Sequence, residues 1–263
     1  EVRHLSYKAN GEILFVGNAY AAAYFGSTTL TAPPILGTNP GVIRYLGKIL
    51  PTGAPTIIKS YINPNFVIDC ATTDSSGNFY LGGNISNTQT ADFGNGIAYT
   101  ASANVAYVAK LNANGDAQWV KIFTFGNTGN MGLEVQRIAV SKLGNIFIAG
   151  YNPNTSINSN KYNAPIYKLD NSGNTLWYKD VLNTYASASY KETRYTINDK
   201  FIDDNENVHL VNFSFNQTFV FNGETLTAPL STIGGTPYTF YVSLDASGTK
   251  RFANAYRGAA TKL

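Results

Sequence analysis

One hairpin-like segment recurs along the chain, and this recurrence constrains the fold more than any other feature of the sequence. Its clearest copy is Ala106-Tyr-Val-Ala-Lys-Leu-Asn-Ala-Asn-Gly-Asp-Ala-Gln-Trp119, an alternating run, a Gly-containing turn and a second run opened by Trp. Related copies have their turn glycines at Gly53, Gly173 and Gly248. Period-two alternation around a Gly turn predicts a β-hairpin. Four copies of it indicate a repeat architecture.

A second marker lies upstream of each hairpin. It is Gly11-Glu-Ile-Leu-Phe-Val-Gly17 in the first copy, and its later copies begin at Gly77, Gly144 and Glu206, the last without either glycine. Each is preceded by another alternating run: 4–8, 67–71, 137–141 and 195–201. The two markers recur together roughly every 65 residues, which defines four repeats at about 3–66, 67–132, 133–192 and 193–256.

Each repeat therefore contains four short strands, and the pattern predicts an all-β chain. Four antiparallel strands per repeat are typical of a β-propeller blade. We expect residues 1–263 to form one domain, a propeller-like array of four four-stranded blades. The array is either a complete small ring or an arc of a larger one. No exchange of terminal strands to close a ring is expected.

The repeats also differ in informative ways. Repeats one, two and four keep a segment that repeat three lacks, and loops that vary while strands persist often carry binding. The copies of this segment are 25–33, 92–100 and 221–229. In repeat one, Thr56 or Ile57 stands at the Trp place and Pro51 and Pro55 flank the turn, which argues against a regular last strand there.

Composition limits the classes of partner. Charged residues are only 13% of the chain and the net charge is +3, without a Lys/Arg run, so nucleic acid is not an expected partner. No stretch approaches the ~18 apolar residues of a membrane helix, so no membrane insertion is expected. The single cysteine, Cys70, lies in an apolar run and is predicted to be a buried, inert thiol rather than a reactive one.

The repeats resemble a known group, the bacterial SBBP-type β-propeller repeats. Repeat two carries the closest match, in Gly77-Asn-Phe-Tyr-Leu-Gly-Gly83, Ala91-Asp-Phe-Gly-Asn-Gly96 and the hairpin ending at Trp119. The resemblance implies a secreted or surface-displayed bacterial protein, often built of many modules. It implies no catalytic residues, so none is carried over, and we expect this chain to be a segment of such a protein.

Two catalytic propeller classes fit poorly. A sialidase-type Asp box and a quinoprotein repeat both require other spacings than those of Asp170, Gly173 and Trp177. A glycosidase also needs two opposed carboxylates, and no such pair stands out. We expect no enzyme activity, no catalytic residues and no cofactor.

Several residues are expected to have structural roles. Trp119 and Trp177 share one repeat position with Phe252, and a ring recurring in every blade favours packing between blades over an exposed sugar-stacking platform. Lys110 and Lys168 are expected to project to water. No metal site is expected at His4 or His209, and 203–206 lacks the order of a calcium loop, so it is predicted to be a plain turn. The predicted repeat anchors are Gly77, Gly115, Trp119, Gly144, Gly173, Trp177, Gly248 and Phe252.

Tyrosine supplies the candidate ligand-binding surface, because its ring is apolar and its hydroxyl can hydrogen-bond. The chain has 18 tyrosines, and the candidates are Tyr20, Tyr24, Tyr185, Tyr190 and Tyr238. Alternating tyrosines on strands are equally compatible with blade packing. The sequence thus predicts a non-catalytic secreted or cell-surface module with a structural or adhesive role. Its expected partners are other modules of the same protein or surface-associated proteins. A carbohydrate-binding, lectin-like propeller is the alternative.

Overall fold

The computed structural model describes residues 1–35, 40–123, 134–151, 161–184, 202–214, 218–221, 224–227 and 238–257. These residues form antiparallel strands joined by turns and contain no helix, so the predicted all-β class is confirmed for the described chain. No helix among these residues is long and apolar enough to cross a membrane. The chain divides into two compact units, Glu1–Thr124 and Phe125–Leu263, and each contains two of the predicted repeats. The expectation of one domain over 1–263 stays a prediction.

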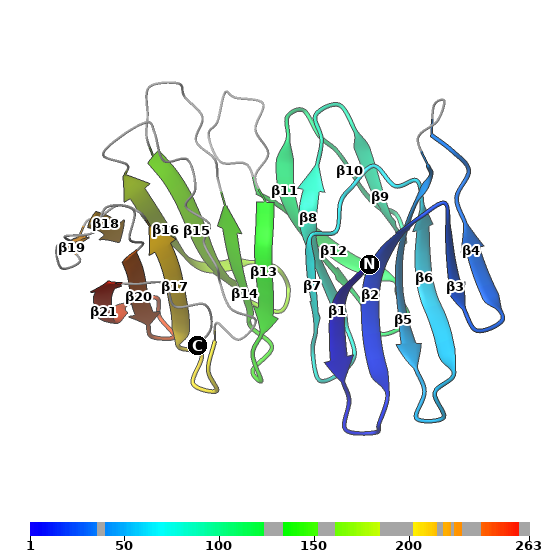
Figure 1. Ribbon diagram of the computed structural model, residues 1–263, viewed down its shortest axis with the longest axis horizontal. Helices are drawn as coiled ribbons and strands as arrows, with labels where there is room; N and C mark the ends of the chain where they lie inside the picture. The colour runs from blue at the N-terminus through cyan, green and yellow to red at the C-terminus, as the bar shows by residue number, and fades with distance from the viewer. Residues whose placement is uncertain are drawn as a thin grey trace. The chain divides into compact units, whose positions relative to one another are not determined.

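Unit 1 contains two four-stranded sheets. The first follows the order β1-β2-β5-β6 and comprises Val2–Tyr7, Ile13–Tyr20, Val42–Ile49 and Pro55–Ile62. The second comprises β7 (Cys70–Thr73), β8 (Phe79–Ile85), β11 (Val105–Leu111) and β12 (Ala117–Phe123). In both sheets, neighbours along the chain are neighbours in space. This is the four-stranded meander that repeats one and two predict (Figure 1).

Unit 2 repeats this meander in part. Its first sheet has six strands in the order β13-β14-β15-β16-β18-β19. The first four, β13 (Glu134–Val140), β14 (Ile146–Tyr151), β15 (Lys161–Leu169) and β16 (Thr175–Thr184), form the meander, and β18 (Thr218–Phe221) with β19 (Glu224–Thr227) extends the sheet beside β16. Its second sheet contains β17 (Val208–Ser214), β20 (Tyr238–Leu244) and β21 (Lys250–Arg257). The run predicted at 195–201 as the first strand of repeat four lies outside the described residues.

The segment that repeat three lacks forms a β-hairpin in each of the other repeats. These hairpins pair β3 (Ala22–Phe25) with β4 (Thr28–Thr31), β9 (Thr90–Gly94) with β10 (Ile97–Thr100), and β18 (Thr218–Phe221) with β19 (Glu224–Thr227). In repeat one the hairpin covers part of the sheet, because Phe25 packs on Phe15 and Tyr45 at ring distances of 5.7 and 4.9 Å.

Pairing registers confirm that the hairpin copies are equivalent. Lys110 pairs with Trp119, Lys168 with Trp177 and Ser243 with Phe252, and a one-residue bulge follows at the same place in each. Repeat one differs only in where its bulge falls. Its β6 is a continuous strand despite Pro51 and Pro55, and the irregularity expected in the last strand is limited to this displaced bulge. Pro55 lies at the first position of the strand, where a missing N–H is tolerated.

The core of each unit lies between its two sheets. In unit 1, Leu14, Val16 and Leu46 of the first sheet pack against Phe79, Leu81, Tyr107 and their neighbours in the second. In unit 2, Phe147 and Ile166 pack against Leu210, Phe240 and Val242. Cys70 is 6% exposed, which confirms its predicted burial.

Candidate functional site

The recurring hairpin segment and the second marker upstream of it form the same turn in every repeat. In repeat two, the Asp74 N–H donates to the Asn78 carbonyl and the Gly77 N–H donates back to the Asp74 carbonyl. One Asp74 carboxylate oxygen accepts from the N–H groups of Ser76 and Asn78, which satisfies backbone donors that the turn leaves unpaired. The same backbone pair of hydrogen bonds closes the turns that start at Lys8, Leu50, Asn112, Ser141, Asp170, Asp203 and Asp245.

The fourth residue of this turn has a positive φ, which glycine adopts without steric cost. All five predicted glycine anchors lie there, with φ of +87° at Gly77, +83° at Gly115, +83° at Gly144, +87° at Gly173 and +79° at Gly248. In repeat four the position is occupied by Glu206, with φ of +62°. A non-glycine residue in this region costs about 1 kcal/mol, so its side chain needs a compensating role.

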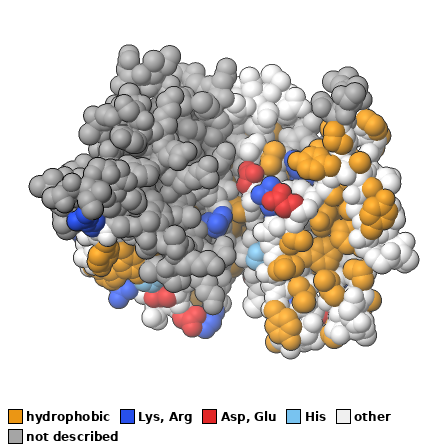
Figure 2. Space-filling model, viewed as in Figure 1, with side chains coloured by type: hydrophobic (Ala, Val, Ile, Leu, Met, Phe, Trp, Pro, Cys, Tyr) orange, Lys and Arg blue, Asp and Glu red, His pale blue; other side chains and the backbone are white. Residues whose placement is uncertain are grey.

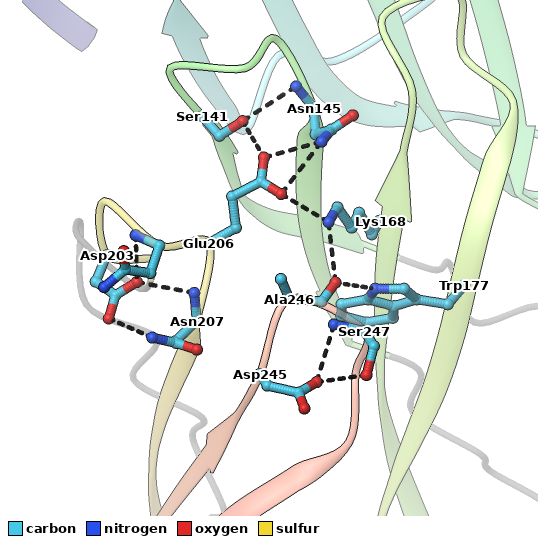
Figure 3. Close-up of polar contacts among 11 residues, drawn as sticks. Ser141, Asn145, Lys168, Trp177, Asp203, Glu206, Asn207, Asp245, Ala246 and Ser247 are labelled. Carbon is cyan, nitrogen blue, oxygen red and sulfur yellow. Dashed lines mark hydrogen bonds and ion pairs between the residues drawn. The ribbon is translucent and has the colours of Figure 1, made fainter.

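Glu206 is only 4% exposed and its carboxylate fastens repeat four to repeat three (Figure 3). Its Oε2 lies 2.7 Å from the Lys168 Nζ, and its Oε1 accepts from the Ser141 hydroxyl and, at 2.9 Å, from the Asn145 amide. Burial alone would raise the pKa of Glu206. The donors from Lys168, Ser141 and Asn145 outweigh it and hold the pKa below its usual value, so the carboxylate stays ionised.

Lys168 and Trp177 converge on one acceptor of the next repeat. The Lys168 ammonium donates to the Ala246 carbonyl at 2.9 Å, and the Trp177 indole N–H donates to the same oxygen, also at 2.9 Å (Figure 3). Trp177 also faces the turn of Gly248, where an added Cβ would lie 3.0 Å from its ring. The structure thus places Trp177 across the boundary between repeats three and four.

The lysines are buried, so the expectation that Lys110 and Lys168 project to water is wrong. They are 9% and 6% exposed. Lys168 lies 5.3 Å from the centre of the Phe147 ring, and Lys110 lies 5.6 Å from that of Tyr80. Burial lowers the pKa of the Lys110 ammonium, while Asp74 acts in the opposite direction. The Lys168 side chain faces the sheet surface on which repeat four packs, and strand alternation alone does not reveal which surface is covered.

Unit 1 contains an equivalent junction with different chemistry. The Lys8 ammonium donates to the Asp74 carbonyl at 3.0 Å, and Thr73 donates its hydroxyl to Ser6 at 2.6 Å, which joins the first strands of the two sheets. An added Cβ at Gly115 would lie 3.0 Å from the Ile58 side chain, as it would at Gly248 from Trp177. Corresponding turns therefore meet corresponding outer strands in both units.

The acidic segment 203–206 forms one of these turns, at the place where the repeat pattern predicts a turn. Asp203 accepts from the backbone of Asn205 and Asn207 and from the Asn207 amide. Burial raises its pKa, but these bonds and His209 together lower it to about 2. Among the described residues no group of three His, Cys, Asp or Glu side chains could hold a metal ion.

His209 completes a short polar chain. Its Nε2 lies 3.4 Å from Asp203, and the Tyr241 hydroxyl lies 2.8 Å from its Nδ1. In repeat two, Tyr80 occupies the place of His209 and donates its hydroxyl to Asp74 at 3.1 Å. Both repeats therefore link this position to the turn carboxylate, and the arrangement supports the turn.

The candidate binding tyrosines fall into three groups. Tyr20 and Tyr24 are 68% and 75% exposed and flank the start of the β3–β4 hairpin. Tyr238 is 7% exposed and belongs to the core of unit 2, so it offers no binding surface. Tyr185 and Tyr190 lie outside the described residues.

Hydrophobic side chains gather on the solvent-facing surface of the first sheet (Figure 2). Sequence reasoning missed three of them, all on β1: Val2, Leu5 and Tyr7 are 55%, 61% and 74% exposed. Strand alternation marks the Leu5 and Tyr7 side of β1, but a single strand cannot show that no sheet covers it.

Comparison with known proteins gives no further identification. No model of a known protein family matches the chain, and no curated protein matches it either.

Proposed function

We propose that this chain is a non-catalytic β-propeller module of a secreted or cell-surface bacterial protein, with a structural or adhesive role. The propeller arrangement is supported by the equivalence of the two junctions. In a propeller each sheet packs on the next through the same face, and here Gly115 meets the outer strand of repeat one as Gly248 meets that of repeat three. The array forms a ring or an arc of SBBP-type repeats.

One observation carries the binding role: large apolar side chains are exposed on the first sheet and on the hairpin that follows its second strand. They include Leu5 and Tyr7 of β1, Tyr20 of β2 and Tyr24 of β3, each more than 60% exposed. Large exposed apolar patches on soluble proteins mark interaction surfaces, whereas isolated exposed side chains do not. The buried polar groups of Figure 3, by contrast, bond to one another between repeats. This division of roles fits a module in which the buried polar residues stabilise the fold and the exposed apolar side chains bind a partner.

Surface display tests this proposal. The chain is displayed on a bacterial host that neither aggregates nor adheres, and adhesion to protein-coated surfaces and to cells is measured. We expect retention above a host with an empty carrier, and a reduction by Tyr20→Ser with Tyr24→Ser. Leu176→Ser is the matched control, because Leu176 is 52% exposed but lies in unit 2. Retention equal to the empty carrier on every surface would contradict the adhesive role, and turnover of a glycoside would contradict the non-catalytic one.

A carbohydrate-binding role is the second candidate. It is favoured by the exposure of Tyr20 and Tyr24, because exposed aromatic rings can stack on sugars while their hydroxyls hydrogen-bond. Weak single sites bind in the ~mM range, near −4 kcal/mol. A glycan array probed above that concentration is expected to show binding that Tyr24→Ser weakens. An array without any binder would exclude this role.

A further inference from the structure

Two polar side chains lie on the buried face of the first sheet of unit 1. Asn18 of β2 and Arg44 of β5 are directly opposite each other in the strand pairing, and they are 6% and 9% exposed. By strand alternation they share the sheet face of Leu14, Val16 and Leu46, which packs on repeat two. Burying polar and charged groups is unfavourable unless they are hydrogen-bonded or paired, so their partners decide what this pair is for.

The hydrogen bonds of Asn18 and Arg44 are incomplete. The Arg44 Nε donates to the Phe66 carbonyl at 2.6 Å, and the Asn18 amide nitrogen donates to the Ile68 carbonyl at 3.3 Å. Both side chains therefore reach the segment between β6 and β7. Among the residues that the structure describes, the buried Asn18 Oδ1 has no hydrogen-bond donor, and the Arg44 guanidinium bonds only through its Nε. A buried acceptor without a donor is unfavourable, and a ligand hydroxyl would satisfy it.

Arg44 also has no ion-pair partner within the described part of the chain. Asp69 acts on it electrostatically from beyond ion-pair distance, and the Asp69 Oδ2 accepts from the Asn84 amide at 3.1 Å. Burial raises the pKa of Asp69, and the positive charges of Arg3 and Arg44 do not outweigh this effect. Arginine stays charged in proteins, so a buried guanidinium without a paired carboxylate favours an anion from outside the chain.

An exposed aromatic ring lies next to this pair along β2. Tyr20 follows Asn18 by two residues, so its side chain projects from the same face of the strand, and it is 68% exposed. The Tyr20 hydroxyl is also close enough to act electrostatically on Arg44. A buried cation, a buried acceptor and an exposed ring are thus found together at one end of the first sheet.

We propose that Arg44, Asn18 and Tyr20 form a binding site for an acidic sugar, one that carries a carboxylate. The carboxylate binds the terminal nitrogens of Arg44, because the planar fork of a guanidinium matches the two carboxylate oxygens. A hydroxyl of the sugar donates to the Asn18 Oδ1, and the sugar ring stacks on Tyr20. The segment between β6 and β7 bonds to both buried side chains, so it shifts when the sugar enters.

A sugar acid fits these three groups better than simpler ligands do. Sulfate or acetate would satisfy Arg44, but neither offers a hydroxyl donor to Asn18 or a ring face to Tyr20. A neutral sugar would leave Arg44 without an anion. The inference rests on the carbohydrate-binding role proposed above and names the class of sugar for it.

Isothermal titration calorimetry of the purified chain tests this inference with a matched pair of ligands. One is a tetrasaccharide of alternating glucuronic acid and N-acetylglucosamine, and the other is the same tetrasaccharide with each carboxylate reduced to an alcohol. We expect the acidic form to bind at least about tenfold more tightly. Arg44→Gln should remove this preference, and Tyr20→Ser should weaken the binding of both forms. Arg251→Gln is the matched control, because it removes the same charge from an exposed arginine in unit 2 and should change neither affinity.

Circular dichroism and the melting temperature show whether each variant is folded. If Arg44→Gln does not fold, the two ligands on the wild type and the exposed-site variant Tyr20→Ser decide the question. Equal affinity of the two forms overturns the inference, and so does a preference for the acidic form that survives Arg44→Gln. Acetate or sulfate that binds as tightly as the acidic tetrasaccharide also overturns it, because the site then recognises an anion without the sugar.

Failure of this inference differs from failure of the carbohydrate-binding role. Neutral glycans that bind without any preference for an acid remove only the inference. A chain that binds no glycan of either kind removes both, and the adhesive role is then decided by the surface-display experiment.

Discussion

Replacing Lys168 by Met should destabilise unit 2 by breaking its buried ion pair while leaving a side chain of similar length. In the wild type the side chains of Lys168 and Glu206 are 8% and 6% exposed, and the Lys168 Nζ lies 2.7 Å from the Glu206 Oε2. Removing one partner from such a pair commonly costs about 3–5 kcal/mol, because the other charge stays buried without compensation. The loss of stability has an upper limit, because Glu206 can become protonated instead of staying charged. Protonating a Glu with a normal pKa at pH 7 costs about 4 kcal/mol. We therefore expect a loss of about 3–4 kcal/mol.

The same reasoning predicts how this loss depends on pH. At pH 5 protonating the stranded Glu206 costs only about 1 kcal/mol, so the penalty of Lys168→Met should shrink toward that value. A double variant, Lys168→Met with Glu206→Gly, removes both charges and restores the glycine of the other repeats at φ of +62°. It should recover to within about 1 kcal/mol of the wild type.

Urea unfolding followed by Trp177 fluorescence, in a Trp119→Phe background, measures these differences. The matched control is Lys142→Met. It breaks the Lys142–Asp204 pair, whose side chains are 74% and 78% exposed, and it should cost less than about 1 kcal/mol. A Lys168→Met variant no less stable than this control, or a double variant no more stable than Lys168→Met alone, would refute the account of Figure 3.

Three further predictions follow from the same contacts. Gly248→Ala should cost on the order of 1–3 kcal/mol more than Gly53→Ala in urea unfolding, because both have positive φ but only Gly248 lies against the Trp177 ring; equal costs would contradict that contact. The pKa of Glu206 is lowered in the folded chain, so its stabilising effect is present above the unfolded pKa and is lost as the pH falls through the folded value; a Glu206→Gln variant should show a smaller loss of melting temperature below about pH 4.5. The buried thiol of Cys70 should react with Ellman's reagent only as fast as the protein opens, and rapid reaction of the native chain would show that it is accessible.

The local sequence pattern predicted most of the secondary structure, because strands and turns depend mainly on residues that are neighbours along the chain. The alternation around Gly115 and Gly173 identified the hairpins, and the extra segment of repeats one, two and four proved to be an additional hairpin in each. In repeat one the prolines suggested an irregular strand, and the structure shows a continuous strand with one displaced bulge. Pro55 is harmless there because it lies at the start of β6, and strand position is not visible from a dipeptide.

The sequence by itself determined the repeat, its strands and its turns, because a two-residue alternation and a glycine at positive φ are local requirements. Only the tertiary structure decided which face of each sheet is covered, since that depends on residues some 60 positions away. It therefore decided that Lys168 is buried beside Glu206, that Tyr238 lies in the core, and that Leu5 and Tyr7 remain exposed.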